Sequence, residues 1–307
     1  MSRTPTPPSA RPTDLLTKSA ALRRLELELR RRLDGRLTGD YLSLATGSGS
    51  ERAGARRYEP GDDARRIDWS LTARSLETHV RTTEADRELH TLCIVDRSAS
   101  LDFGTARREK REVVLATLAA FGIVTGRSGN RLGVVIAGGD RLTHLPPRQS
   151  REGLLAALSR VYDTPRRDDR PGPGADLFGA LEWAHRTQRH RGQIVIASDF
   201  LENSDWATAL RRLGLRHRVV AVHVTDPREL QLTPVGILGV VDVETGRRVH
   251  VQTNSPTLRA RYAEAAQARH GRIGTSIRHA GADYLHLSTD RDWVLDLARF
   301  LTRRRSP

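Results

Sequence analysis

Cysteine is almost absent from this chain of 307 residues, and the single one, Cys93, lies inside an apolar run. One cysteine excludes an intramolecular disulfide framework and a cysteine-rich zinc site, and it favours a reducing compartment. Long hydrophobic runs are also missing, since no run approaches the roughly 18 apolar residues that a membrane span needs. Residues 1–12 are rich in Ser, Thr and Pro and lack the apolar core of a secretory signal. We therefore expect a soluble, cytoplasmic protein.

Lysine is nearly absent as well. Lys18 and Lys110 are the only lysines, although the net charge is +14 and the pI is about 11.1. Arginines carry the positive charge and are scattered along every segment, which indicates basic solvated faces more than a nucleic-acid patch. We do not expect nucleic-acid binding, but arginine-mediated binding of nucleic acid and peripheral contact with a membrane stay open as alternatives.

Several catalytic and nucleotide-binding signatures are missing. The chain has no Gly-x-x-x-x-Gly-Lys loop, no Gly-x-Gly-x-x-Gly fingerprint and no Gly-x-Ser-x-Gly elbow ahead of a helix. The eleven histidines show no spacing typical of metal ligands. These absences argue against a nucleotide-binding protein and a serine hydrolase, and we expect a protein that is not an enzyme.

The pattern along the chain predicts an α/β fold. We expect residues 1–12 to form a disordered leader. Leucines at helical spacing predict a basic amphipathic helix over 13–35, and residues 36–90 are polar and glycine-punctuated. From residue 91 to 307, strands alternate with helices, which predicts a doubly wound, mostly parallel sheet with an inserted β-hairpin at about 235–252. The expected strands are 91–96, 131–137, 142–145, 193–197, 218–224 and 283–287, and the expected helices are 105–126, 150–161, 176–190, 204–213, 256–270 and 291–304.

Oxygen-bearing side chains follow two of the expected strands. The run Leu-Cys-Ile-Val ends in Asp96-x-Ser98-x-Ser100, and a second apolar run ends at Asp199. Ligands of doubly wound sheets bind outside the carboxyl ends of the strands, so neighbouring strands would bring Asp199 to the same crevice as Asp96. Carboxylates and hydroxyls suit Mg²⁺, or Mn²⁺ or Ca²⁺. The alternative is that each aspartate only caps the turn that follows its strand.

The Asp-x-Ser-x-Ser motif with a later strand-end aspartate resembles the metal-ion-dependent adhesion site of von Willebrand factor A domains. The resemblance implies metal ligands at Asp96, Ser98, Ser100 and Asp199, and a further threonine from an intervening loop. Ala175 stands where that threonine would be, so one ligand is missing unless Asp176 replaces it. We therefore expect weak binding or an empty site.

A second motif precedes the first expected strand. Residues 56–69 read Arg-Arg-Tyr-Glu-Pro-Gly-Asp-Asp-Ala-Arg-Arg-Ile-Asp-Trp, followed by Thr72-Ala73-Arg74. The charges predict a network of ion pairs in an irregular segment. A less favoured alternative is a metal-dependent phosphoesterase that uses the same ion together with Asp62 and Asp63.

This stretch, with Asp-x-Ser-x-Ser and Phe103-Gly104-Thr105 after it, resembles the bacterial domain-of-unknown-function family fifty-eight, which couples such a segment to a von Willebrand A-like domain. Members often accompany a MoxR-type AAA+ ATPase in chaperone-like maturation of other proteins. The resemblance therefore implies an interaction module with that ATPase and a client protein as partners. The metal ion would bind an acidic residue of the partner.

Overall fold

Four strands of the central sheet are short runs rich in valine and isoleucine, and they are buried on both faces. They are β3 (His90–Asp96), β4 (Arg131–Ala137), β6 (Gln193–Ser198) and β7 (Arg218–Thr225). Continuous apolar runs of this kind are typical of parallel strands that helices cover on both sides. The computed structural model describes residues 12–34, 54–75, 77–82, 90–106, 108–127, 129–138, 142–166, 176–241 and 248–302.

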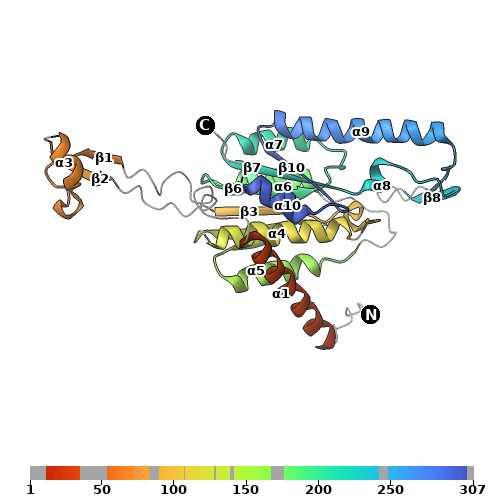
Figure 1. Cartoon of the computed structure of the whole chain (residues 1–307), viewed down its shortest axis with the longest axis horizontal. Coiled ribbons are helices and arrows are strands. Elements are labelled where there is room, and N and C mark those ends of the chain that lie inside the picture. Colours follow the sequence, from red (N-terminus) through yellow and green to blue (C-terminus); the bar gives the residue numbers. More distant parts are fainter. Residues whose placement is uncertain are drawn as a thin grey trace, which may run out of the picture.

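The sheet has the order β10-β7-β6-β3-β4-β5 (Figure 1). Its first five strands run parallel, with β10 (Asp283–Ser288) at one edge. At the other edge β5 (Thr143–Arg148) pairs antiparallel with β4. The predicted α/β class and the doubly wound, mostly parallel sheet are thus confirmed.

Helices cover the two faces of the sheet with separate apolar cores. Cys93 and Val95 of β3 face the core that the first group of helices covers, whereas Leu92 and Ile94 face the second. The first group is α1 (Pro12–Asp34), α4 (Lys110–Arg127), α5 (Arg151–Tyr162) and α10 (Trp293–Thr302). The second group is α6 (Leu177–Thr187), α7 (Trp206–Gly214) and α9 (Pro256–His279).

Helix α1 packs on the domain that follows it in the chain. Leu22, Leu29 and Leu33 are buried in the same core as α4, α5 and α10. The buried carboxylate of Glu26 pairs with Arg30 on its own helix and with Arg151 on α5. The amphipathic helix expected over 13–35 is therefore present, and its apolar stripe lies against protein.

Two smaller elements lie outside the main sheet. Strands β1 (Gly54–Arg57) and β2 (His79–Thr82) pair antiparallel around a 3₁₀ turn and α3 (Trp69–Ser75), and Figure 1 shows this unit apart from the sheet. Strands β8 (Ile237–Val241) and β9 (Arg248–Gln252) form the expected hairpin beyond the short helix α8 (Pro227–Leu230).

Three helix boundaries differ by three or more residues from the sequence-based expectation. Helix α4 begins at Lys110 and not at 105, because Thr105 is held by Asp226 and the main chain turns first through a bond from Lys110 N to Phe103 O. Helix α9 continues nine residues beyond 270, because Ile273 and Ile277 pack into the core. Helix α6 ends at Thr187 and not at 190. The expected leader lies outside the described residues except for Pro12, which begins α1.

Candidate functional site

The two strand-end aspartates lie beside each other at the switch point of the sheet. Strand β3 pairs with β6 in parallel, with Val95 opposite Ala197, so that both strands deliver their next polar residues to the same edge. The chain runs from β3 outward to β4 on one side and continues from β6 to β7 on the other, and doubly wound folds bind ligands at such a point. Asp96 and Asp199 are both buried. The condition under which Asp199 was expected to reach the crevice of Asp96, that the two strands are neighbours, is therefore met.

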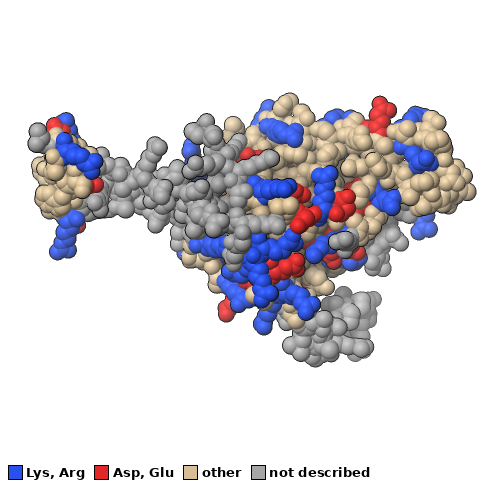
Figure 2. Space-filling model, in the orientation of Figure 1, with Lys and Arg blue, Asp and Glu red and all other residues tan. Residues whose placement is uncertain are grey.

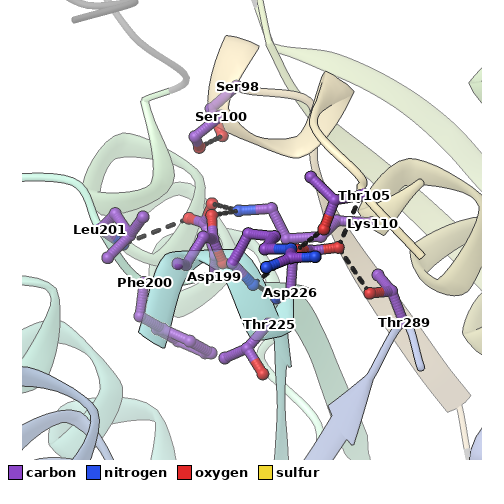
Figure 3. Close-up of polar contacts among 12 residues, drawn as sticks. Ser98, Ser100, Thr105, Lys110, Asp199, Phe200, Leu201, Thr225, Asp226 and Thr289 are labelled. Carbon is purple, nitrogen blue, oxygen red and sulfur yellow. Dashed lines mark hydrogen bonds and ion pairs between the residues drawn. The ribbon is translucent and has the colours of Figure 1, made fainter. Parts of the chain in front are cut away.

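Asp96 is held by groups from both strands. Its Oδ1 accepts a hydrogen bond from the main-chain N–H of Ser98 at 2.7 Å, and its Oδ2 accepts one from the hydroxyl of Ser198 at 2.5 Å. The hydroxyls of Ser98 and Ser100 lie 3.0 Å apart and hydrogen-bond to each other. The Asp-x-Ser-x-Ser motif thus folds into a compact turn, and Figure 3 shows Ser98 and Ser100 above the carboxylate of Asp199.

Asp199 is paired with a buried lysine from the start of α4. Lys110 Nζ donates to Asp199 Oδ2 at 2.8 Å and also to Oε1 of Glu229 on α8, and its side chain is fully buried. Asp199 Oδ1 accepts from the N–H of Leu201 at 3.2 Å. Figure 3 shows the Lys110 ammonium directed at the Asp199 carboxylate. The site therefore contains its own positive charge.

The charges of the site perturb one another. Burial, with the nearby charge of Asp199, raises the pKa of Asp96 to about 7. Burial also acts to raise the pKa of Asp199, but the Lys110 ammonium and a hydrogen bond from Ser100 keep it below its ordinary value. Burial opposes the charge of Lys110, yet Asp199 and Glu229 raise its pKa. Lys110 thus neutralises the charge of Asp199. The repulsion between the two carboxylates appears instead in the raised pKa of Asp96.

A third strand-end aspartate, Asp226, connects the loops that carry Thr105 and Thr289 next to the Lys110–Asp199 pair. It accepts hydrogen bonds from the N–H and hydroxyl of Thr105, at 2.9 and 2.6 Å, and from the hydroxyl of Thr289 at 2.7 Å (Figure 3). It also begins α8 with a capping box in which Glu229 accepts from the N–H of Asp226. This network fixes Glu229 where it meets Lys110.

The four predicted ligands have suitable chemistry for a hard divalent cation. Asp96, Ser98, Ser100 and Asp199 supply two carboxylates and two hydroxyls, which are ligands that Mg²⁺ prefers when waters complete its shell. In the described part of the chain, no cluster of three or more His, Cys, Asp or Glu has a geometry suited to a metal ion. The donor set is therefore small, and Lys110 holds one of its two carboxylates.

The loop in which the family has a threonine ligand carries Ala175 and Asp176 here, and its described part provides no ligand. Ala175 lies outside the described residues. Asp176 is exposed and uses its Oδ1 to accept from the N–H of Gly179 at 2.6 Å, which caps the N-terminus of α6. The capping of α6 therefore explains the presence of Asp176 without a cation.

The acidic residues of the segment before β3 cap turns. Asp62 accepts from the N–H of Glu59, Asp63 from that of Arg65, and Asp68 from those of Ser70 and Leu71. Asp62 and Asp63 lie between β1 and α3, and Figure 1 shows these elements apart from β3, which ends at Asp96. This arrangement gives no support to their participation in the alternative phosphoesterase site.

Lys110 and Glu229 were not among the residues that the sequence predicted for the site. The sequence offers one signal for Lys110, because it is one of two lysines among 51 basic residues and it follows the Asp-x-Ser-x-Ser motif closely. Glu229 lies three residues after Asp226, as a capping box requires, but the pattern alone predicts only a helix start. The contact between the two residues spans 119 positions, so only the fold reveals it.

Basic side chains on the surface are mixed with acidic ones. Figure 2 shows Lys and Arg most densely over the lower helices of the view, with Asp and Glu among them. Several form ion pairs, including Arg32 with Asp292 and Arg166 with Glu109. None of the described helices is both long enough and apolar enough to span a bilayer.

Comparisons with known proteins point to one family. The model described as "Protein of unknown function DUF58" matches residues 54–272. The uncharacterized protein Rv1480 of Mycobacterium tuberculosis is 44% identical over 287 residues, which cover 94% of this chain and 90% of that protein. The uncharacterized protein MAV169 of Mycobacterium avium is 37% identical over 164 residues, covering 53% of this chain and 95% of that protein.

The solved structures that match this chain are more distant in sequence. The conserved hypothetical protein BatB from Bacteroides thetaiotaomicron is 12% identical and has a TM-score of 0.44, over 70% of this chain and 97% of that one. The SpRpn10 VWA domain is 13% identical with a TM-score of 0.37, over 68% of this chain and 93% of that one.

Proposed function

The chain belongs to the DUF58 family, and from the geometry of its site we propose that it is a non-enzymatic module that binds a partner protein. The binding face is the carboxyl edge of the sheet. Asp96, Ser98, Ser100 and Asp199 would hold a divalent cation there, and an acidic residue of the partner would complete its coordination. The observation that carries this proposal is the convergence of Asp96 and Asp199 beneath two hydroxyls at the switch point.

The positions of the four side chains suit recognition at a surface. The carboxylates are buried, whereas Ser98 and Ser100 are partly exposed and lie between them and solvent. A cation at this position would offer a coordination site to a carboxylate of the partner protein. Ser198 and the N–H of Ser98 hold Asp96 in place, and the N–H of Leu201 does the same for Asp199.

The hairpin β8–β9 offers apolar surface to the same partner. Ile237 is 70% exposed, and Val240 and Val249 are also exposed. The hairpin follows α8, which carries Glu229 of the site, and Figure 1 shows both elements at one end of the molecule. Exposed apolar side chains gathered on a two-stranded hairpin are typical of an interaction surface.

The resemblance to the family implies which partners to test. We propose a MoxR-type AAA+ ATPase as the working partner and a separate client protein whose maturation or assembly the pair assists. The cytoplasm remains the expected compartment.

The test is a binding experiment with the full chain and the AAA+ ATPase encoded nearest to it. We expect binding in Mg²⁺ or Mn²⁺ and its loss in EDTA or in Asp96→Ala. Glu264→Ala, an exposed carboxylate on α9, is the matched control and should bind as the wild type does. Binding that neither EDTA nor Asp96→Ala changes would contradict the proposal.

The alternative functions predict other results. A metal-dependent phosphoesterase at the same site would hydrolyse generic phosphodiesters and lose that activity in Asp96→Ala. Nucleic-acid binding through arginines would weaken steeply with salt. We expect neither result.

A further inference from the structure

We propose that Lys110 is the resident counter-ion of the cation site: a divalent cation displaces it from Asp199, and Glu229 then holds the ammonium alone. This inference rests on the proposed function, because it requires that Asp96 and Asp199 bind a cation. It adds that the Lys110 ammonium competes with the cation for Asp199 and so determines how tightly the site binds metal.

The first step concerns burial. The Lys110 side chain is fully buried, and its ammonium lies 2.8 Å from Asp199 Oδ2. Removing an ammonium from water costs several kcal/mol unless opposite charges surround it. Asp199 and Glu229 provide those charges, so the carboxylates position Lys110 at the place where the cation would contact Asp199.

The second step concerns the balance of charge. Asp96, Asp199 and Glu229 carry three negative charges when ionised, and Lys110 carries one positive charge. Asp96 receives its hydrogen bonds from the N–H of Ser98 and the hydroxyl of Ser198, both neutral donors. Lys110 therefore leaves the cluster two positive charges short, which is the charge of one divalent cation.

The third step concerns where the ammonium goes. Lys110 already contacts Glu229, so it can leave Asp199 without losing its ion pair. Glu229 is held by the capping box at the start of α8, and its side chain is about a quarter exposed, which puts it toward the outer side of the site. A lysine suits this exchange, because its ammonium is a compact charge on a flexible stem.

The exchange gives the site two states that differ in one contact. In the first state Lys110 bridges Asp199 and Glu229. In the second state Asp96 and Asp199 would hold the cation, and Lys110 would remain with Glu229. Since the cation must compete with a covalently tethered ammonium, Lys110 lowers the affinity of the site for metal.

The test is a calorimetric titration of the full chain with Mn²⁺. We expect Lys110→Met, which keeps the length of the side chain and removes its charge, to bind Mn²⁺ at least tenfold more tightly than the wild type. Lys18→Met removes the only other lysine and is the matched control, with wild-type affinity expected. Wild-type or weaker affinity in folded Lys110→Met would overturn the inference.

A second variant covers the case in which Lys110→Met does not fold. Glu229→Gln removes the alternative partner of the ammonium, so Lys110 should stay on Asp199 and Mn²⁺ should bind several-fold more weakly than in the wild type. Unchanged or tighter binding in Glu229→Gln would overturn the inference.

The outcomes separate this inference from the proposed function. Mn²⁺ binding to Lys110→Met alone would show that Lys110 blocks the site completely, which would contradict both the displacement of Lys110 and a cation in the wild-type site. Equal binding to wild type and Lys110→Met would overturn the inference and leave the proposed function standing. No binding to any of the proteins would overturn both.

Discussion

The hydroxyl of Ser198 donates a 2.5 Å hydrogen bond to Oδ2 of Asp96 and so joins the ends of β6 and β3. The hydroxyl oxygen of Ser198 also accepts a hydrogen bond from the N–H of Phe200 at 2.9 Å. Phe200 has a φ of 54°, in the left-handed region that a bulky residue rarely adopts. Asp199 lies between Ser198 and Phe200. Ser198 therefore stabilises the turn that directs the Asp199 side chain toward the site.

Ser198→Ala should destabilise the protein by about 1–3 kcal/mol, because it leaves a buried carboxylate oxygen and a buried N–H without their partner. Chemical denaturation measures the change. Ser204→Ala is the matched control, since the Ser204 hydroxyl is buried without a hydrogen-bond partner and its removal should cost far less. Equal losses in the two variants would contradict the role assigned to Ser198.

Helix α1 makes a second testable contribution to stability. Leu29→Ala should destabilise the protein by about 2–4 kcal/mol, because Leu29 is buried among helices of the first core. Leu27→Ala is the control on the same helix, since Leu27 is 47% exposed. A Leu29→Ala variant as stable as Leu27→Ala would show that α1 does not pack on the domain in solution.

Three histidines form a cluster between β7, β10 and α9, in which His223 is buried and His270 and His286 are partly buried. The rings of His223 and His270 stack with centroids 4.9 Å apart, and His286 contacts His270 edge-on at 4.6 Å. Burial, with the neighbouring histidines, lowers the pKa of His223 to about 3, and burial lowers that of His286 to about 4. The surrounding polar and charged groups are Asp199, Lys110, Thr225, Arg278, Tyr284, Asp290 and Arg291.

These lowered pKa values predict a loss of stability in acid. Below about pH 6.5 the histidines of the unfolded chain take up protons that the folded cluster resists, so the free energy of unfolding falls as the pH drops from 6.5 toward 4. Asp96 acts in the opposite direction, because its raised pKa makes the folded state bind a proton first. A comparison of variants isolates the histidines.

His286→Gln should lose less stability than the wild type between pH 7.5 and pH 5, by about 1–2 kcal/mol. His250→Gln, an exposed histidine on β9, is the control and should follow the wild type. Chemical denaturation at the two pH values measures the difference, and the same pH dependence in all three proteins would contradict the account.

The sheet and most helices could be predicted from the sequence because local patterns determine them. The run Leu92–Val95 is typical of a buried strand, and the geometry of parallel sheets brings Asp96 and Asp199 to one edge, provided that β3 and β6 are neighbours. The Asp-x-Ser-x-Ser turn likewise needs only neighbouring residues, since Asp96 accepts from Ser98 two positions on.

The contents of the site between those strand ends could not be predicted in this way. Lys110 reaches Asp199 and Glu229 across 89 and 119 positions, and no local pattern records either contact. The start of α4 was wrong for the same reason, because Thr105 is bound by Asp226 from a distant loop. The histidine cluster joins three elements, so the spacing of histidines in the sequence does not reveal it.

The central claim is that this edge of the sheet binds a divalent cation through Asp96 and Asp199. A calorimetric titration of the wild-type chain with Mn²⁺, repeated with Asp96→Ala and Glu264→Ala, tests it most directly. We predict saturable binding of one ion to the wild type and to Glu264→Ala, and its loss in Asp96→Ala. Absence of binding in the wild type, or the same affinity in Asp96→Ala, would contradict the claim.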